Sequence, residues 1–372
     1  MNKGLKGLEE RVITQDLCAA CGACLSLCPY LRSWKGRVIK LDDCNLEEGR
    51  CFAYCPRTEV DLDGVFRNIF GKGYEEIEMG PVRKVMMARA RDPQFTKKAQ
   101  TGGIVSALVD FALKEGLIQN AVLSPRDEEL LPHGKIIKNR REILSCSGSS
   151  YVSGPTLEAF NRGPWKGKER IGIVGLPCQV LALARMKASK LDRRTPIDRV
   201  DLVIGLFCTW ALDYRPFTVF LKKRVNGLPV KKLNITPPPE RILEVTSGNK
   251  LVRIPIDDIR PFIRPSCRVC LDMTAELSDL SVGTVEGREG WNTVIVRTAM
   301  GEDLLKRAKK AGIIETKSLP KDNLDHLIEA SLLKKRRALD ALKERGEIEK
   351  GYLNLSADLV KRIVSASEET KP

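Results

Sequence analysis

The sequence predicts an α/β (α+β) protein, with a small cysteine-rich module before the α/β part and a basic helical tail after it. Short apolar runs that helical patterns follow predict the α/β part, because such runs are typical of buried strands. The cysteines predict the module, since eleven of the twelve fall into two groups. With 372 residues, the chain is long enough for more than one domain.

The first cysteine group begins with Cys18, Cys21, Cys24 and Cys28, which Pro29 follows. The run C-x2-C-x2-C-x3-C-P is the ligand pattern of ferredoxins, in which close spacing wraps the backbone around one iron–sulfur cubane. This pattern is specific, and it predicts that the chain transfers electrons.

Cys44, Cys51 and Cys55 complete the first group and repeat the end of the motif, C-x3-C-P. In two-cluster ferredoxins the fourth cysteine of each run ligates the other cluster. The predicted ligands are therefore Cys18, Cys21, Cys24 and Cys55 for one cluster and Cys28, Cys44 and Cys51 for another.

The second of these ligand sets is short by one cysteine, and Glu48 stands where the usual fourth ligand would lie. Three possibilities stay open. The cluster can be a three-iron type, or it can take an oxygen ligand from Asp43, Glu47 or Glu48. It can also be absent, in which case its cysteines are structural.

The α/β part begins after the module, in residues 65–98, which we expect to form a linker and a first strand, KVMMARAR. Apolar positions from 104 to 112 follow a helical period, with Thr101 as the expected cap and Gly116 as the end. Two glycines before this helix let a ligand approach the backbone, and the exposed N–H groups favour an anion. A Gly-Gly turn alone is weak evidence for a ligand site.

The next segments continue the α/β pattern. We expect strands over residues 117–123, 170–174 and 200–207, a helix over 180–187, and mostly loops over 125–165.

The second cysteine group comprises Cys178, Cys208, Cys267 and Cys270. Cys178 and Cys208 follow predicted strands, and open α/β sheets bind their ligands at the carboxyl ends of strands. Four thiolates suffice for one 4Fe–4S cluster or one zinc. Alternatively, Cys178 and Cys208 are buried core thiols. Cys146 stands apart, and we interpret it as a structural thiol.

The charge of the chain is +15, although residues 1–65 hold nine Lys and Arg against ten Asp and Glu and so carry −1. Lys334, Lys335, Arg336 and Arg337 form a basic run on a predicted C-terminal helix, where we expect a solvated face. Attraction of an acidic redox partner or substrate is the alternative. Aromatic content of 5% leaves few platforms for stacking bases, so we expect no nucleic-acid partner.

Features that are absent from the sequence indicate its compartment and its catalytic class. No apolar run approaches the roughly 18 residues that span a bilayer, and the first residues lack the apolar core of a secretory signal. We therefore expect no membrane span and a cytoplasmic location, where cysteine clusters usually bind metal. The two histidines leave little room for histidine-based catalysis.

Several segments together resemble the beta subunit family of coenzyme F420-reducing hydrogenases and related formate dehydrogenases. They lie between about residues 85 and 330: QTGGIVSALV at 100–109, GIVGLPCQ at 172–179, GLFC at 205–208, SCRVCLDMTAELSDLSVGTV at 266–285 and GWNTVIVRT at 290–298. The added module is similar to the electron-input subunits of deazaflavin-oxidising membrane complexes.

The resemblance implies bound FAD in the α/β domain and one 4Fe–4S cluster beside it, with Cys178, Cys208, Cys267 and Cys270 at its ligand positions. It also implies the residues that contact the flavin: Thr101, Gly102, Gly103, Ile104, Ser106, Ser149, Tyr151, Trp291, Asn292 and Thr293. The family often has Gly-x-Lys-Tyr near residue 150, but here Ser150 replaces the lysine. Loss of that cation can mean a different hydride donor.

The resemblance therefore implies a ferredoxin-like iron–sulfur module, an α/β flavin-binding domain and a C-terminal helical tail. The expected boundaries are 1–65 for the module, 66–165 and 166–330 for the two parts of the flavoprotein domain, and 331–372 for the basic tail.

The implied function is an F420-dependent type of oxidoreductase. Electrons would pass between reduced coenzyme F420 or a similar hydride carrier, FAD, two or three 4Fe–4S clusters and a partner subunit. Expected partners are other subunits of a hydrogenase, formate dehydrogenase, heterodisulfide reductase or membrane complex. NADH as donor and a flavin-free electron-wiring subunit are the alternatives. No general base is required, because hydride and electron transfer are cofactor chemistry.

Overall fold

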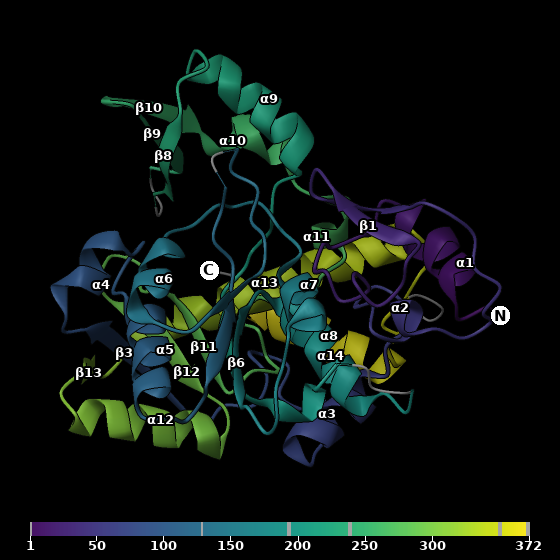
Figure 1. The fold of residues 1–372 in the computed structure, drawn as a ribbon, viewed down its shortest axis with the longest axis horizontal. Helices are drawn as coiled ribbons and strands as arrows, with labels where there is room; N and C mark the ends of the chain where they lie inside the picture. The colour runs from purple at the N-terminus through teal and green to yellow at the C-terminus, as the bar shows by residue number, and fades with distance from the viewer. Residues whose placement is uncertain (1, 128, 192–194, 237–239, 349–351, 370–372) are drawn as a thin grey trace.

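The computed structural model describes residues 2–127, 129–191, 195–236, 240–348 and 352–369, and a mixed sheet of eight strands lies at the centre of this described part (Figure 1). The strand order is β13-β3-β12-β11-β7-β6-β4-β5. The strands are β3 (Lys84–Ala90), β4 (Asn120–Leu123), β5 (Lys135–Ile137), β6 (Ile171–Gly175), β7 (Val200–Leu206), β11 (Leu280–Thr284), β12 (Asn292–Val296) and β13 (Ile314–Lys317).

The pairing of the strands gives the sheet one edge where most of them end. β4, β6, β7 and β11 pair in parallel, and β3 runs in the same direction because both β3 and β11 are antiparallel to β12. We call the edge where these strands end the carboxyl edge. The strands predicted at 170–174 and 200–207, and those within 84–91 and 117–123, are confirmed.

Helices cover both faces of the sheet, which explains why β4, β6 and β12 are buried throughout. One face packs against α4 (Pro93–Lys98), α5 (Ile104–Lys114), α6 (Arg140–Ser145) and α12 (Ala299–Lys310). The other packs against α3 (Leu62–Phe70), α7 (Thr156–Arg162), α8 (Pro177–Ala188), α13 (Lys321–Glu344) and α14 (Ala357–Glu369). No described helix is both long enough and apolar enough to cross a membrane.

The ends of α5 test two sequence predictions. Gly116 follows the helix at φ +63°, in the left-handed conformation expected there. Thr101 is not the cap, because Gly103 occupies that position and the Thr101 hydroxyl accepts a hydrogen bond from Asn292 instead. Four short helices, α3, α4, α6 and α7, were missed as linker or loop. These helices are too short to show a long helical period in the sequence. Packing against the sheet and neighbouring helices stabilises them.

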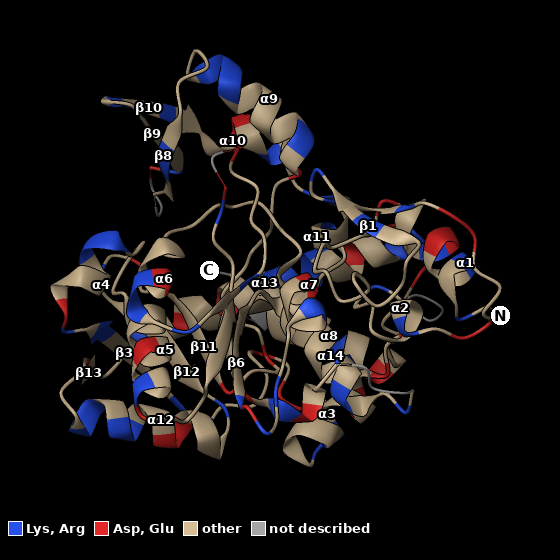
Figure 2. Ribbon diagram, viewed as in Figure 1, with Lys and Arg blue, Asp and Glu red and all other residues tan. Residues whose placement is uncertain are grey.

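A small unit over residues 213–264 stands beyond the carboxyl edge, at the top of Figure 1, and was also missed. It contains α9 (Tyr214–Arg224), β8 (Val230–Ile235), β9 (Ile242–Ser247), β10 (Lys250–Pro255) and α10 (Ile256–Ile259). The three strands form their own antiparallel sheet, and Phe217 and Leu233 are part of a separate core. Figure 2 shows Lys and Arg residues along α9 and the strands of this unit.

The N-terminal module contains little regular structure besides α1 (Leu5–Leu8), a hairpin of β1 (Leu31–Trp34) and β2 (Arg37–Lys40), and α2 (Arg50–Ala53). Figure 1 places it beside α7, α8 and α11 (Pro265–Arg268), so it rests on the larger domain. Arg37 of β2 makes an ion pair with Asp213, 2.6 Å away at the start of the small unit.

The predicted solvated face on the C-terminal helix is wrong for its first two residues. Lys334 and Lys335 of α13 are 4% and 0% exposed. The helical period places them with Leu327, Ser331 and Leu342 on the face that packs into the protein. Lys335 contacts the buried carboxylate of Glu276, which offsets the cost of burying its charge. Residues 349–351 and 370–372 of the predicted tail lie outside the described residues.

Candidate iron–sulfur and flavin site

The cysteines of the N-terminal module gather in two sets, divided as their spacing predicts. Burial raises the pKa of Cys24 well above its usual value, and neighbouring thiols that include Cys21, Cys18 and Cys55 raise it further. We call Cys18, Cys21, Cys24 and Cys55 the first set. A raised pKa of this kind means that forming several thiolates together costs energy, and the positive charge of bound iron offsets that cost.

A second set comprises Cys28, Cys44 and Cys51. Burial raises the pKa of Cys51 to about 12, and Cys28 and Cys44 add to that rise. The loop from 41 to 48 around Cys44 is exposed apart from Cys44 itself, which is half-buried. That these two sets hold iron stays a prediction.

Helix α7 holds the loop of the first set against the larger domain. Asn161 donates hydrogen bonds to the carbonyl oxygens of Gly22, Ala23 and Leu25 at 3.3, 3.0 and 2.8 Å. Gly22 has φ +86°, and a Cβ there would lie 2.7 Å from the backbone nitrogen of Glu158. The cysteine loop therefore packs on α7 at a position where only glycine fits.

The third set comprises Cys178, Cys208, Cys267 and Cys270, and the fold brings it together from three distant segments. Cys178 lies in the first turn of α8, after β6, and Cys208 follows β7, the strand next to β6. The Sγ atom of Cys267 accepts a hydrogen bond from Ala211 at 3.3 Å, which ties α11 to the chain after β7. The set thus lies at the carboxyl edge, as expected from the strand ends.

The charges around the third set shift the pKa values of its thiols in opposite directions. Burial raises the pKa of Cys178 to about 12; the Arg57 guanidinium opposes this rise, and the Cys270 and Cys267 thiols increase it. For Cys270, burial would also raise the pKa, but Lys334 and Arg57 together hold it below its usual value.

A single ion and a cluster need different spacings of their ligands. A cubane spreads its thiolates over four different irons, so its ligands stand further apart than those of zinc. Among the described residues, no three His, Cys, Asp or Glu side chains are grouped closely enough to hold one metal ion. That the third set holds a 4Fe–4S cluster stays a prediction.

The first and third sets adjoin each other. Besides burial, the Cys178 thiol raises the pKa of Cys21 more than Cys55 or Cys18 of its own set does. The N-terminal module therefore brings its first set near the cysteines of the carboxyl edge.

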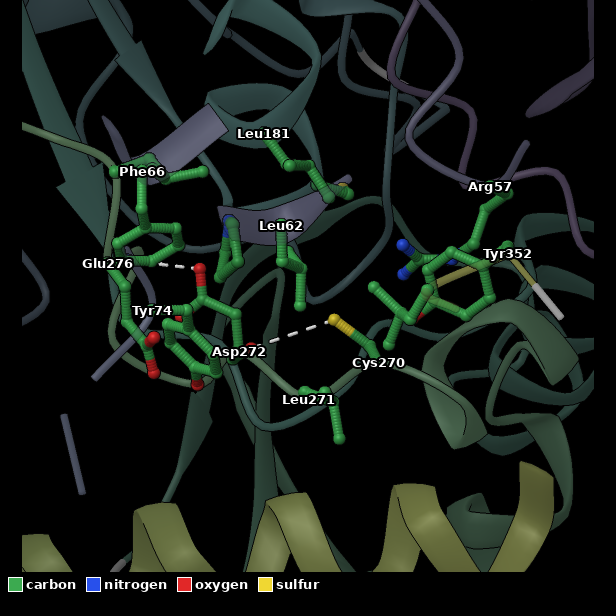
Figure 3. Close-up of a pocket in the computed structure, with 14 residues that line it drawn as sticks. Arg57, Leu62, Phe66, Tyr74, Leu181, Cys270, Leu271, Asp272, Glu276 and Tyr352 are labelled. Atoms are coloured by element: carbon green, nitrogen blue, oxygen red, sulfur yellow. Dashed lines mark hydrogen bonds between the residues drawn. The ribbon is translucent and has the colours of Figure 1, made fainter. Parts of the chain in front are cut away.

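A small cavity of about 40 Å³ lies against the third set (Figure 3). Cys178 is among its lining residues. Cys270, Arg57 and Tyr352 line one part of the cavity, and the acidic side chains of Asp272 and Glu276 lie on the other side (Figure 3). The sulfur side of the cavity thus carries a buried cation, and the far side carries carboxylates.

The candidate flavin contacts fall into separate places, of which the first is the loop before α5. The side-chain amide of Asn292 donates to the Thr101 hydroxyl and, at 3.0 Å, to the Gly283 carbonyl oxygen. A Cβ on Gly102 would lie 2.7 Å from the Asn292 oxygen, so packing alone requires this glycine. Thr101, Gly102, Gly103, Ile104 and Asn292 thus form one group at the carboxyl edge.

Ser106, Ser149 and Tyr151 lie on the side of that loop nearer the small unit. Ser106 is 3.4 Å from Ser147, and Ser149 hydrogen-bonds with Tyr151. The Tyr151 hydroxyl accepts a hydrogen bond from the backbone nitrogen of Ile235 in β8 at 2.9 Å. β8 therefore faces the candidate flavin contacts, and sequence analysis gave no sign of this.

The structure does not bring Trp291 and Thr293 together with Asn292, because successive side chains of a strand point to opposite faces. Trp291 is 8% exposed, and its ring lies between Arg89 at 4.6 Å and Lys317 at 4.9 Å. Thr293 donates to the Thr284 carbonyl oxygen.

Sequence analysis missed the buried cations beside the cysteines, which include Arg57, Arg185, Arg264 and Lys334. One signal was available, since Arg57 directly follows Cys55 and Pro56 of the ligand motif. Lys334 gave no such signal, because it stands in a run of charges that usually faces water.

Fold and site together define an α/β redox subunit that carries a ferredoxin-type module and groups cysteines at the carboxyl edge of its sheet. Comparison with known proteins identifies its family. The family model described as coenzyme F420 hydrogenase/dehydrogenase, beta subunit N-term matches residues 85–161, and that of the C terminus matches residues 168–322.

Two curated relatives extend this result. The chain is 30% identical to the coenzyme F420 hydrogenase subunit beta of Methanothermobacter thermautotrophicus, over 73% of this chain and 97% of that protein. It is 26% identical to the coenzyme F420-dependent sulfite reductase of Methanocaldococcus jannaschii, over 91% of this chain and 52% of that protein.

A solved structure shows the same fold. A chain of the F420-reducing NiFe hydrogenase complex from Methanosarcina barkeri superposes with a TM-score of 0.68 at 28% identity, over 75% of this chain and 98% of that chain. The chain therefore belongs to the coenzyme F420 hydrogenase/dehydrogenase beta subunit family, and the predicted fold class, family and oxidoreductase class are confirmed. The family models leave residues 1–84 and 323–372 unmatched.

Proposed function

We propose that this chain passes electrons between reduced coenzyme F420 and a partner protein, through FAD and a row of iron–sulfur clusters. The observation that carries the proposal is that Cys178 of the third set lies near enough to Cys21 of the first set to raise the pKa of its thiol. It links the carboxyl edge, where a flavin would bind, with a module whose cysteine pattern is that of ferredoxins.

Each cysteine set has a place in this row. Cys178, Cys208, Cys267 and Cys270 would hold the cluster nearest the flavin, and the first set would hold the next. Cys28, Cys44 and Cys51 would hold the last, beside the exposed loop from 41 to 48, where a partner can approach. Its fourth ligand stays open between a three-iron cluster, an oxygen of Asp43, Glu47 or Glu48, and no cluster.

The flavin would bind at the carboxyl edge. Bound FAD accepts a hydride and releases electrons singly, which connects a two-electron carrier to one-electron clusters. Thr101, Gly102, Gly103 and Asn292 would shape its site, with the N-terminal end of α5 facing its pyrophosphate. Ser106, Ser149 and Tyr151 would contact it from the side of β8, and Trp291 and Thr293 would support it from the other face of β12.

The basic small unit suits an acidic cofactor. Lys222, Lys223 and Arg224 form the last turn of α9, and Lys231 and Lys232 lie on β8 above the carboxyl edge (Figure 2). A positive potential there raises the local concentration of an anionic coenzyme.

NADH in place of the deazaflavin is the second candidate, and Ser150 is the observation that favours it. Ser150 stands where the family often has lysine, and its hydroxyl donates to the Val152 carbonyl oxygen at 3.1 Å. Its side chain therefore offers no cation to the donor. A flavin-free subunit that only wires clusters together is the third candidate.

Anaerobically purified chain tests these candidates directly. We expect about twelve irons with three clusters, or about eight with two, together with acid-releasable flavin. We also expect reduction of the clusters by reduced coenzyme F420 and none by NADH. Reduction by NADH alone would select the second candidate, and a flavin-free, iron-loaded protein would select the third.

The cellular setting completes the proposal. The related hydrogenase chain was solved within a complex, so we propose that this chain also works as one subunit of an electron-transfer complex. A hydrogenase, a formate dehydrogenase, a heterodisulfide reductase or a membrane complex would supply the partner, in the cytoplasm.

A further inference from the structure

At least four buried cations stand beside the first and third cysteine sets. One of them, Arg264, is 3% exposed and donates to the carbonyl oxygen of Cys18 at 2.8 Å. The other three are Lys334, Arg57 and Arg185. Lys334, on α13, is 4% exposed. Its ammonium donates to the carbonyl oxygens of Cys208 at 2.6 Å and Asp272 at 2.7 Å. Lys334 therefore binds the backbone at Cys208 of the third set and at Asp272, two residues after Cys270.

Arg57 comes from the N-terminal module and reaches the same set. It is 3% exposed, donates to the carbonyl oxygen of Ser266 at 3.2 Å and hydrogen-bonds with the Cys270 thiol. Its guanidinium lies over the Tyr352 ring at 5.0 Å and lines the cavity beside Cys178 (Figure 3). Because Arg57 also acts on the Cys55 thiol, it lies between the two sets.

Arg185 serves only the first set. It lies on α8, is 9% exposed, and donates to the carbonyl oxygens of Ala53 at 2.8 Å and Thr58 at 3.2 Å. These two carbonyls flank Cys55, whose thiol it influences. Its hydrogen bonds therefore hold the turn that carries the last ligand of the set.

A buried cation is costly unless a nearby negative charge offsets it, and carbonyl dipoles do so only in part. A four-thiolate cubane is such a charge, and its reduction adds one more electron to it. A cation nearby stabilises the reduced form more than the oxidised form, so it raises the reduction potential.

We propose that Lys334, Arg57 and Arg185 are positioning residues that set the reduction potentials of two clusters selectively. Lys334 raises the potential of the cluster on the third set, Arg185 raises that of the cluster on the first set, and Arg57 raises both. The inference rests on the proposed function. Since the cations belong to different elements, each potential depends on how the module, α8 and α13 pack together.

Potentiometric titration of the full chain, followed by electron paramagnetic resonance, tests this selectivity. Each signal is assigned by its loss in Cys178→Ser and in Cys18→Ser. We expect Lys334→Met to lower only the third-set potential by at least about 59 mV, a tenfold change in the one-electron equilibrium constant. Arg185→Met should lower only the first-set potential by a similar amount, and Arg57→Met should lower both.

Controls separate charge from folding. Lys187 also donates to a backbone carbonyl, that of Val200 at 3.0 Å, but at the start of β7 away from the cysteines. Lys187→Met should leave both potentials unchanged. Lys334→Arg and Arg57→Lys keep the charge, so their cluster potentials should stay close to those of the wild type. If a methionine variant loses its cluster, Lys334→Arg and Arg57→Lys still test the proposal. Clusters that are retained at wild-type potentials in these two variants support the role of charge.

Two results would overturn the proposal. One is unchanged potentials in Lys334→Met and Arg57→Met with clusters intact, and the other is an equal shift in Lys334→Arg and Lys334→Met. Wild-type chain without any cluster signal would instead refute the proposed function itself.

Discussion

The two cysteine groups of this chain are built in opposite ways. The N-terminal group follows one local motif from Cys18 to Cys55, and its loop is held from outside by α7. The other group, Cys178 to Cys270, is assembled at the ends of neighbouring strands. A local motif can keep its geometry when neighbouring elements shift, whereas an assembled site depends on the register and packing of the whole sheet.

Removal of single ligands should give the largest difference between the two groups. We expect Cys178→Ser to lose about four irons and to abolish reduction of the N-terminal clusters by reduced coenzyme F420. Cys44→Ser, at the exposed end, should leave the first and third sets loaded and still reducible. Iron and sulfide analysis with rapid-mixing spectroscopy measures both. Wild-type electron passage in Cys178→Ser would break the comparison.

Loss of the buried ion pair behind the assembled group should be the next largest effect. Burial disfavours the Lys335 ammonium, but the Glu276 carboxylate, together with Tyr74 and Asp272, more than compensates and holds the pKa of Lys335 above its usual range. Lys335→Met leaves that carboxylate buried without its cation and should destabilise the fold by about 3–5 kcal/mol. The midpoint of thermal unfolding reports the loss.

The matched control for that ion pair is the double variant Lys335→Met with Glu276→Gln. Because it removes both charges, it should recover at least half of the lost stability. A double variant as unstable as Lys335→Met would show that packing, and not charge, holds α13 on the Cys270 segment.

The local group should be sensitive to one glycine instead. Gly22→Ala needs φ +86° and places its Cβ 2.7 Å from the Glu158 nitrogen, so we expect a cost of about 2–4 kcal/mol. Gly71→Ala is the control, since it has φ +76° and nothing within 4 Å of its Cβ, and should cost about 1 kcal/mol. Denaturant midpoints under anaerobic conditions compare the two, and equal costs would refute close packing of the loop on α7.

The contrast between the groups also explains what the sequence could predict. The cysteines of the first motif could be expected to meet, because covalent spacing limits how far apart they lie, and their division into two ligand sets stays a prediction. Cys178 and Cys208 could be placed at the carboxyl edge, because each follows an apolar strand. Arg57 and Lys334 could not be predicted, since charged residues are buried only where a tertiary partner exists, and local sequence does not show that partner.

The flavin contacts show a second limit of sequence analysis. Asn292 and Trp291 are adjacent in the sequence and both belong to a segment that resembles the family, yet the pleat of β12 separates them. Sequence analysis missed the elements of residues 213–264 for another reason. β8 and β10 carry lysine and are exposed or half-exposed at most positions, so their alternation is weak. β9 alternates regularly before the turn at Gly248, so one hairpin signal was available and was overlooked.

The smallest expected effect tests the contact between the N-terminal module and the rest of the chain. Burial raises the pKa of Asp213, but the Arg37 guanidinium of the module more than offsets this and holds that pKa below its usual value. A lowered pKa in the folded state stabilises the protein above pH of about 4 and loses that contribution as pH falls through the folded value.

Asp213→Asn keeps the helix cap on Arg215 but removes the charge, so we expect a cost of about 1–2 kcal/mol at pH 7. The difference between wild type and variant should shrink as pH falls toward 4 and below, because protonated Asp213 also lacks the charge. Thermal midpoints of both proteins at each pH give this difference, in which the acid sensitivity of bound clusters cancels. A difference that is constant with pH would mean that Arg37 joins the module to the larger domain through packing rather than through its ion pair.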